Sequence, residues 1–149
     1  MKYVRVAAIG LLSIVNAPWV CAETDYLNAG IVAKGDLPFS EAVQVENVLY
    51  LSGQVGIVPK TQKLIEGGIQ TESLQAMENI KSVAEAYGYG MSDIVKCTIF
   101  LTDLKELKVF NDNYKSFFAT GRYPARSAVE VRALALGSRV EVECMAAKS

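Results

Sequence analysis

The chain has 149 residues, enough for about one domain. Hydrophobic residues make up 51% of it and charged residues 21%, a balance typical of a globular protein with its own core. Lys and Arg number 15 against 16 Asp and Glu, so the net charge of −1 does not indicate a nucleic-acid-binding surface. The chain contains no histidine, which excludes Ser-His-Asp triads and most zinc sites. Acid–base chemistry would then have to come from carboxylates, Lys, Tyr, Cys or bound water.

The N-terminus is typical of an export signal. Lys2 and Arg5 precede an apolar run at positions 6–15, and small residues precede a cleavage site after Ala22. The run is shorter than the ~20 residues that a membrane span needs. We therefore expect a signal peptide at 1–22 and a mature chain in the bacterial periplasm, free of the membrane. The alternatives are a buried N-terminal helix or strand, an uncleaved anchor, or a lipid anchor on Cys21.

Two cysteines, Cys97 and Cys144, remain in the mature chain. An oxidising compartment would allow them to form one disulfide. Both lie in apolar segments, and a free cysteine commonly behaves as a small buried hydrophobic residue. We therefore expect two buried thiols in preference to a disulfide.

Hydrophobic periodicity divides the mature chain, residues 23–149, into strands and helices of a single domain. In chain order the expected elements are an extended arm at 23–37, a β-hairpin with strands at 42–45 and 48–51, a loop at 56–68, a helix at 71–87, a strand at 94–101, a helix at about 104–118, and strands at 125–131 and 139–146.

Both helices are predicted from apolar residues at steps of three and four. The first set is Leu74, Met77, Ile80, Ala84 and Tyr87, and the second is Leu104, Leu107, Phe110, Tyr114 and Phe117. Asp103 is a candidate N-cap of the second helix, with Glu106 as its capping-box partner.

The order β-β-α-β-α-β-β predicts an α+β sandwich in which two helices cover one face of a sheet. The segments 48–51 and 94–101 are apolar on both strand faces. A sheet face that is apolar and uncovered predicts an oligomer, in which sheets pack across subunits.

Arg126 is the first candidate site residue. It opens a strand directly after Pro124, and a guanidinium at the mouth of a strand can bind a carboxylate with two parallel hydrogen bonds. The alternative is a surface arginine without a partner. Glu141 and Glu143 lie on one face of the last strand, where acids usually face solvent; one of them could instead orient or activate a water.

Three further residues are weaker candidates. Ser52 and Gly53 end a buried strand, where a glycine permits close approach of a ligand but more often makes a turn. Asn111 lies in mid-helix, directly after the apolar Phe110, at a position where Asn is a poor helix former, so it could bond a ligand or a loop.

Taken together, these segments resemble the RidA family, also called the YjgF-like or reactive-intermediate deaminase family. The resemblance lies in motifs that come in the family's order with similar spacing and extend from about residue 35 to 146: LSGQ at 51–54, GGI at 67–69, QAMENI at 75–80, VKCTIFLTD at 95–103, NDNY at 111–114 and PARSAVEV at 124–131.

The resemblance implies a chorismate-mutase-like fold with a mixed sheet of about six strands, and a homotrimer with pockets between subunits. It also implies a hydrolase acting on C–N bonds, which converts short-lived enamines and imines of the 2-aminoacrylate and 2-iminopropionate type to 2-oxo acids and ammonia. No cofactor or metal is implied. The alternatives are a non-catalytic, small-carboxylate-binding or chaperone-like trimer of the same fold and, ranked last, a chorismate-mutase-like isomerase.

By resemblance, Arg126 is the residue that binds the substrate carboxylate and Glu141 is the acid near the attacking water. Ser52, Gly53 and Asn111 match pocket-lining positions. Two further pocket positions depart from the family pattern: Ala128 stands where many members have Cys, and Phe39 stands where the best-known deaminases often have Tyr. Both changes make the pocket more apolar and bear on the choice of substrate.

Overall fold

The computed structural model describes residues 23–148. The predicted signal at 1–22 lies outside the described residues, so the signal peptide and its cleavage after Ala22 stay predictions. The elements in chain order are β1 (Thr24–Leu27), β2 (Ala42–Val45), β3 (Val48–Val55), β4 (Ile57–Val58), β5 (Lys63–Leu64), α1 (Ile69–Ala86), β6 (Ile94–Leu101), α2 (Leu107–Lys115), β7 (Ala125–Glu130) and β8 (Val140–Ala147), with short 3-10 turns at Met91–Asp93, Leu104–Glu106 and Ala135–Gly137.

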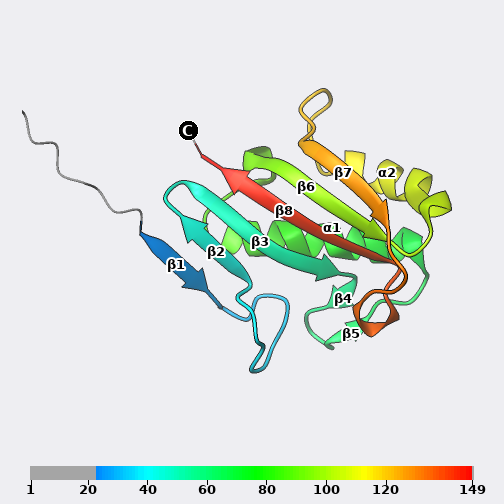
Figure 1. Ribbon diagram of the computed structural model, residues 1–149, viewed down its shortest axis with the longest axis horizontal. Coiled ribbons are helices and arrows are strands. Elements are labelled where there is room, and N and C mark those ends of the chain that lie inside the picture. Colours follow the sequence, from blue (N-terminus) through cyan, green and yellow to red (C-terminus); the bar gives the residue numbers. More distant parts are fainter. Residues whose placement is uncertain (1–22, 149) are drawn as a thin grey trace, which may run out of the picture.

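The main sheet has six strands in the order β1-β2-β3-β8-β6-β7. Every neighbouring pair is antiparallel except β6 and β7, which are parallel because α2 lies on the crossover between them. Both helices cover the same face, as Figure 1 shows. The predicted α+β class, the mixed sheet of about six strands and the two helices on one face are therefore confirmed. None of the helices in residues 23–148 is long and apolar enough to cross a membrane.

The helix predicted at 71–87 is confirmed as α1, but its buried stripe differs from the prediction. Leu74 stays 37% exposed, whereas Ser73 and Asn79 are buried. These polar side chains can be buried because their hydrogen bonds are satisfied. The amide of Asn79 donates to the Val55 carbonyl at 3.0 Å and to the Ile57 carbonyl at 2.9 Å, which ties α1 to the end of β3.

The second helix is shorter than the predicted 104–118. Asp103 is an N-cap, but of the 3-10 turn Leu104–Glu106 that precedes α2: its side chain accepts a hydrogen bond from the Lys105 amide at 2.9 Å. The N-cap position of α2 itself is Glu106, which makes no side-chain capping bond. The predicted capping box with Glu106 is wrong: the Glu106 carboxylate instead forms an ion pair with the Arg139 guanidinium. The ion pair with Arg139, the residue directly before β8, thus replaces the capping hydrogen bond that the sequence spacing predicted for Glu106.

Two short strand regions were not predicted. Part of the arm at 23–37 is β1, which extends the sheet beyond β2, and the loop at 56–68 contains the β4–β5 hairpin. β1 is exposed along nearly its whole length, with Tyr26 74% exposed. A strand that buries no face shows no alternation of polar and apolar residues, which explains why periodicity missed it.

The expectation of two free thiols is wrong. Cys97 and Cys144 form a disulfide, with their Cα atoms 4.1 Å apart. The two residues lie directly opposite each other on β6 and β8, on the buried face of the sheet. The Cα separation is that of a non-hydrogen-bonded antiparallel pair, the arrangement that brings cross-strand side chains closest. The strand register, and not burial alone, therefore decides whether these two cysteines are free thiols or a disulfide.

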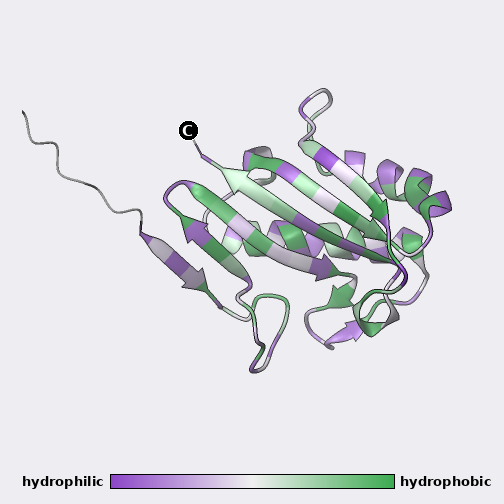
Figure 2. Cartoon of the chain, viewed as in Figure 1, coloured by the Kyte–Doolittle hydropathy of each residue, from purple (hydrophilic) through white to green (hydrophobic). Residues whose placement is uncertain are grey.

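The second face of the sheet carries no helix. The hydropathy of the residues varies along each strand, as the colours in Figure 2 show. Tyr50 on β3 is 45% exposed and Val129 on β7 is 41% exposed, while Phe100 and Met145 are half-buried. We call this surface the open face. The predicted oligomer, which would cover it, stays a prediction.

Candidate active site

Arg126 lies on the edge strand β7, on the face of the sheet that the helices cover. In the parallel register it is opposite Cys97, which belongs to the core face of β6. Its Nη1 donates a hydrogen bond to Asn111 Oδ1 on α2 at 2.6 Å. The guanidinium carbon also lies 5.1 Å from the centre of the Tyr114 ring, within the range of a cation–π contact. The structure thus brings Arg126 and Asn111 together.

A cavity of about 250 Å³ opens beside this arginine. Its lining residues are Asn111, Tyr114, Lys115, Tyr123, Pro124 and Arg126. The lining contains two cationic side chains and no carboxylate. Among the described residues, Arg126 has no ion-pair partner, whereas Arg139 is paired with Glu106. An unpaired guanidinium beside a second cation favours a small anion as ligand.

Tyr114 forms the inner wall of this cavity and was not predicted as a site residue. Its side chain is 3% exposed, and its hydroxyl has no hydrogen-bond partner among the described residues. Burial raises the pKa of Tyr114 to about 12, against a smaller opposing effect of the Arg126 charge. The phenol is therefore neutral at physiological pH. The signal for this contact was the spacing of Asn111 and Tyr114, which places both on one face of a helix.

Glu141 lies on the open face, opposite to the side of Arg126. On β8 its neighbours are Val55 of β3 and Phe100 of β6, both outside the core. Its carboxylate is half-buried, and this burial raises its pKa; the nearby negative charge of Glu143 raises the pKa further. A carboxylate with a raised pKa is a better proton acceptor than an ordinary surface acid.

Gly53 lies directly under the Glu141 side chain. A Cβ atom at position 53 would be 2.0 Å from Glu141 Oε1, so only glycine leaves room for this carboxylate. The strand register shifts between Leu51 and Gln54, which is a β-bulge at Ser52 and Gly53. The sequence predicted that a ligand would approach Gly53 closely; in the structure the Glu141 side chain occupies that space. Ser52, the preceding residue, donates its hydroxyl to the Ser40 carbonyl at 2.6 Å.

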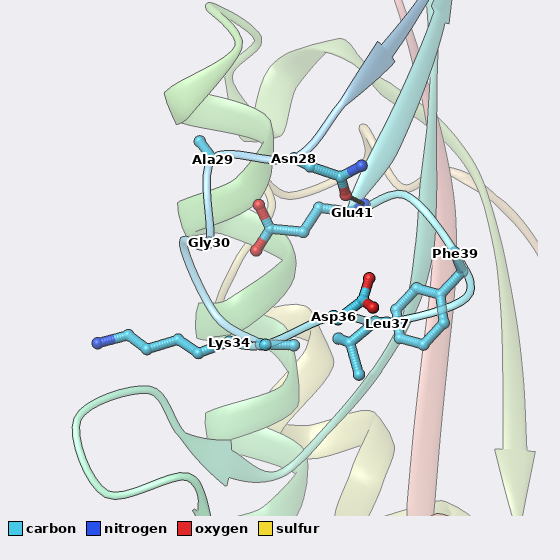
Figure 3. Close-up of a pocket in the computed structure, with 10 residues that line it drawn as sticks. Asn28, Ala29, Gly30, Lys34, Asp36, Leu37, Phe39 and Glu41 are labelled. Carbon is cyan, nitrogen blue, oxygen red and sulfur yellow. Dashed lines mark hydrogen bonds between the residues drawn. The ribbon is translucent and has the colours of Figure 1, made fainter.

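Phe39 lies in the long loop between β1 and β2 and is 50% exposed. This loop surrounds a cavity of about 560 Å³, which Figure 3 shows with Phe39 beside Leu37. The buried Glu41 holds the loop in place. Its carboxylate accepts hydrogen bonds from the Val32 amide at 2.9 Å and from the Tyr87 hydroxyl at 3.3 Å. Ser52 is connected to Phe39 through its hydrogen bond to the neighbouring Ser40 carbonyl. Ser52 does not line the cavity beside Phe39.

The predicted site residues thus form two groups within one chain. Arg126 and Asn111 lie on the helix side of the sheet, and Ala128 lies on the same face of β7, half-buried against the core. Glu141, Gly53 and Ser52 gather around the bulge on β3, with the Phe39 loop bonded to it. A single chain does not bring the two groups together. In residues 23–148 there is also no cluster of three or more His, Cys, Asp or Glu side chains suited to a metal ion.

Comparison with known proteins identifies the fold and the motifs. The family model described as Endoribonuclease L-PSP matches residues 33–148. The 2-iminobutanoate/2-iminopropanoate deaminase of Mus musculus is 42% identical over 109 residues, which is 73% of this chain and 80% of the mouse protein. The crystal structure of RidA from the Antarctic bacterium Psychrobacter is 36% identical, with a TM-score of 0.78, and covers 83% of this chain and 99% of that one.

Escherichia coli TdcF, crystallised with bound serine, is 31% identical with a TM-score of 0.77, and the match covers 84% of this chain and 99% of that one. The resemblance noted in the sequence is therefore confirmed. The chain belongs to the RidA (YjgF-like) family, which the L-PSP family model describes.

Proposed function

We propose that this protein is an imine deaminase, which hydrolyses 2-imino and 2-enamino carboxylates to 2-oxo acids and ammonia. The observation that supports this most directly is the guanidinium of Arg126: it has no carboxylate partner among the described residues, and it borders a cavity with a second cation. Such a site suits a small carboxylate. The mouse relative, 42% identical over 73% of this chain, is named for the same chemistry.

The reaction needs only positioning and one proton shuttle. Arg126 binds the carboxylate and holds the electrophilic iminium carbon near a water. The carboxylate of Glu141 accepts a proton from that water as its oxygen bonds to the carbon, which gives a carbinolamine. The same proton then returns to the nitrogen. The C–N bond breaks as the hydroxyl gives its own proton to Glu141 and becomes the carbonyl of the 2-oxo acid. Glu141 passes that proton to the departing ammonia, which leaves as ammonium. Because the iminium is already electrophilic, correct placement supplies much of the rate.

We further propose that the working unit is a homotrimer in which Arg126 of one subunit faces Glu141 of its neighbour. The two residues lie on opposite faces of one sheet, so one chain cannot apply both to the same substrate. The open face, with Tyr50 and Val129 exposed, would be covered in this assembly. A pocket between subunits resolves the separation of the two groups of site residues.

The identity of the substrate depends on Ala128 and Phe39. A methyl group replaces a thiol at one position and a phenyl ring replaces a phenol at the other, so both contribute apolar contacts. We propose that this pocket prefers imines with a small apolar side chain, of the 2-iminopropionate and 2-iminobutanoate type. The serine bound to TdcF indicates that a related site accepts a small amino acid.

We propose export to the periplasm, where the Cys97–Cys144 disulfide would be stable. Mass spectrometry of the secreted product would find an N-terminus at Glu23; an intact Met1 would contradict cleavage.

The deaminase proposal is tested by generating 2-iminopropionate in solution and following its loss with the purified mature protein. The protein should accelerate hydrolysis well beyond the buffer rate. Pyruvate is the 2-oxo acid that this reaction produces. If the protein binds pyruvate but leaves the rate of imine loss at the buffer value, the non-catalytic carboxylate-binding trimer is the correct alternative.

The pH dependence of the reaction should reflect Glu141. The base must be ionised, so activity falls as the pH drops through its raised pKa, at a higher pH than for an ordinary glutamate. Glu143→Gln removes the like charge, lowers the pKa of Glu141, and should therefore move the acidic limb of the pH–rate profile to lower pH. Burial, the larger cause, is unchanged in this variant. The exposed Glu78 on α1 provides the control Glu78→Gln, which should leave the limb in place. A limb that does not move in Glu143→Gln contradicts the assignment.

Gly53→Ala should reduce turnover without unfolding the protein. The added methyl would overlap Glu141 Oε1, the mobile end of a side chain, so the carboxylate can move away at little cost in stability. We expect kcat to fall roughly tenfold or more, as for loss of a general base. Gly90→Ala is the matched control, because its new methyl would have no neighbour closer than 3.6 Å. Equal kcat in the two variants would argue against a role for Glu141.

A further inference from the structure

The Arg126 guanidinium has two fixed contacts, and both come from α2. Asn111 accepts a hydrogen bond from Nη1 at 2.6 Å. Tyr114, three residues further along the helix, presents its ring to the guanidinium carbon at 5.1 Å. Residues three apart lie on the same face of a helix, so one turn of α2 contacts both an edge and a face of the same charged group.

The two contacts restrain different motions. A hydrogen bond at Nη1 fixes one point of the guanidinium but leaves its plane able to rotate about that point. An aromatic ring beneath the group restrains the plane itself. A bidentate grip on a carboxylate requires the plane to be correct, because two parallel N–H bonds must reach two oxygens. The remaining N–H groups are then left for the ligand.

The Tyr114 ring is itself held rigidly. Its centre lies 5.6 Å from that of Phe110 and 4.8 Å from that of Phe118, both at tilted angles. Aromatic pairs at these distances stabilise a defined ring orientation. The side chain is 3% exposed, so solvent does not compete for its position. A rigid neighbour imposes its orientation on a flexible arginine at the surface, and not the reverse.

The hydroxyl of Tyr114 takes no part in this arrangement. It has no hydrogen-bond partner among the described residues and is shielded from solvent. The interaction with Arg126 is therefore one of the ring. We propose that Tyr114 is a positioning residue, whose ring sets the plane of the Arg126 guanidinium for a bidentate grip on the substrate carboxylate. This inference rests on the proposed function of Arg126.

The test compares Tyr114→Leu, which removes the ring, with Tyr114→Phe, which removes only the hydroxyl. Tyr89→Leu is the matched control: Tyr89 is also 3% exposed and its ring also lies under a cation, Lys148 Nζ at 4.6 Å. For 2-iminopropionate, Tyr114→Leu should raise KM about fivefold or more and change kcat less than about twofold, because the carboxylate is bound equally in the ground and transition states. Tyr114→Phe and Tyr89→Leu should keep KM within about twofold of wild type.

Binding of pyruvate, measured by calorimetry, distinguishes failure of this inference from failure of the proposed function. If wild type does not turn over the imine, the deaminase proposal fails, and the Kd values for pyruvate in the same variants still decide the role of Tyr114. An unchanged KM and Kd in Tyr114→Leu overturns the inference, and so does an equal loss in Tyr114→Phe. Tyr114→Met, which fills more of the space without a ring, replaces the Leu variant if that variant does not fold.

Discussion

Arg126→Ala should reduce kcat/KM for 2-iminopropionate at least about a hundredfold, to a rate that matches buffer. In the proposed site, the variant would lose two charge-assisted hydrogen bonds to the substrate carboxylate, each worth about 1.5–3 kcal/mol. The side chain is exposed and forms no ion pair among the described residues, so the variant should fold normally. The measurement is the rate of imine loss at several substrate concentrations.

Arg132→Ala is the control for loss of a surface cation, since Arg132 is exposed and follows the same strand. It should retain the wild-type rate. Arg126→Lys keeps the charge but not the planar fork, and its rate should fall between those of wild type and the alanine variant. Wild-type activity in Arg126→Ala would show that another group binds the carboxylate.

Loss of the Cys97–Cys144 disulfide should produce the largest change in stability. The bond closes a loop with a sequence separation of 47 and links β6 to β8 at the centre of the sheet. A cross-link of that span lowers the entropy of the unfolded chain, by an amount equivalent to about 4 kcal/mol. Urea unfolding of the oxidised protein should therefore give a free energy of unfolding higher than that of the reduced protein by roughly this amount.

Comparing the oxidised and reduced forms of one sequence separates the cross-link from changes in side-chain volume. The double variant Cys97→Ala/Cys144→Ala should show no dependence on reductant. If wild type unfolds at the same urea concentration with and without reductant, the two sulfurs are not bonded, and the buried thiols expected from the sequence are the correct state.

Local patterns in the sequence were sufficient for the helices and the central strands. The step of three from Met77 to Ile80 and the step of four from Ile80 to Ala84 led to α1. The alternation of Val140, Val142 and Cys144 led to β8. These signals are strong because the elements bury one face against a core. The register between strands, which decides the Cys97–Cys144 bond, depends on residues 47 apart in the chain and has no local signal.

The candidate site was predicted as a set of residues but not as a geometry. The alternation on β8 already placed Glu141 opposite the core. The side of Arg126 could not be predicted, because β7 is an edge strand on which every residue except Ala128 is exposed. A strand with so little buried surface does not reveal which of its faces points inward. The separation of Arg126 from Glu141 therefore emerged only from the three-dimensional structure.

That separation leads to the most direct test of the proposal that two subunits share each pocket. Arg126→Ala and Glu141→Gln proteins are prepared separately, then unfolded and refolded together in equal amounts. In a ring of three, about three-quarters of random trimers contain both kinds of subunit, and each of these has one pocket of three with both residues intact. We predict that each variant alone hydrolyses 2-iminopropionate at the buffer rate, and that the mixture recovers about one quarter of the wild-type activity. A mixture that stays at the buffer rate, while refolded wild type is active, would contradict a pocket formed by Arg126 of one subunit and Glu141 of the next.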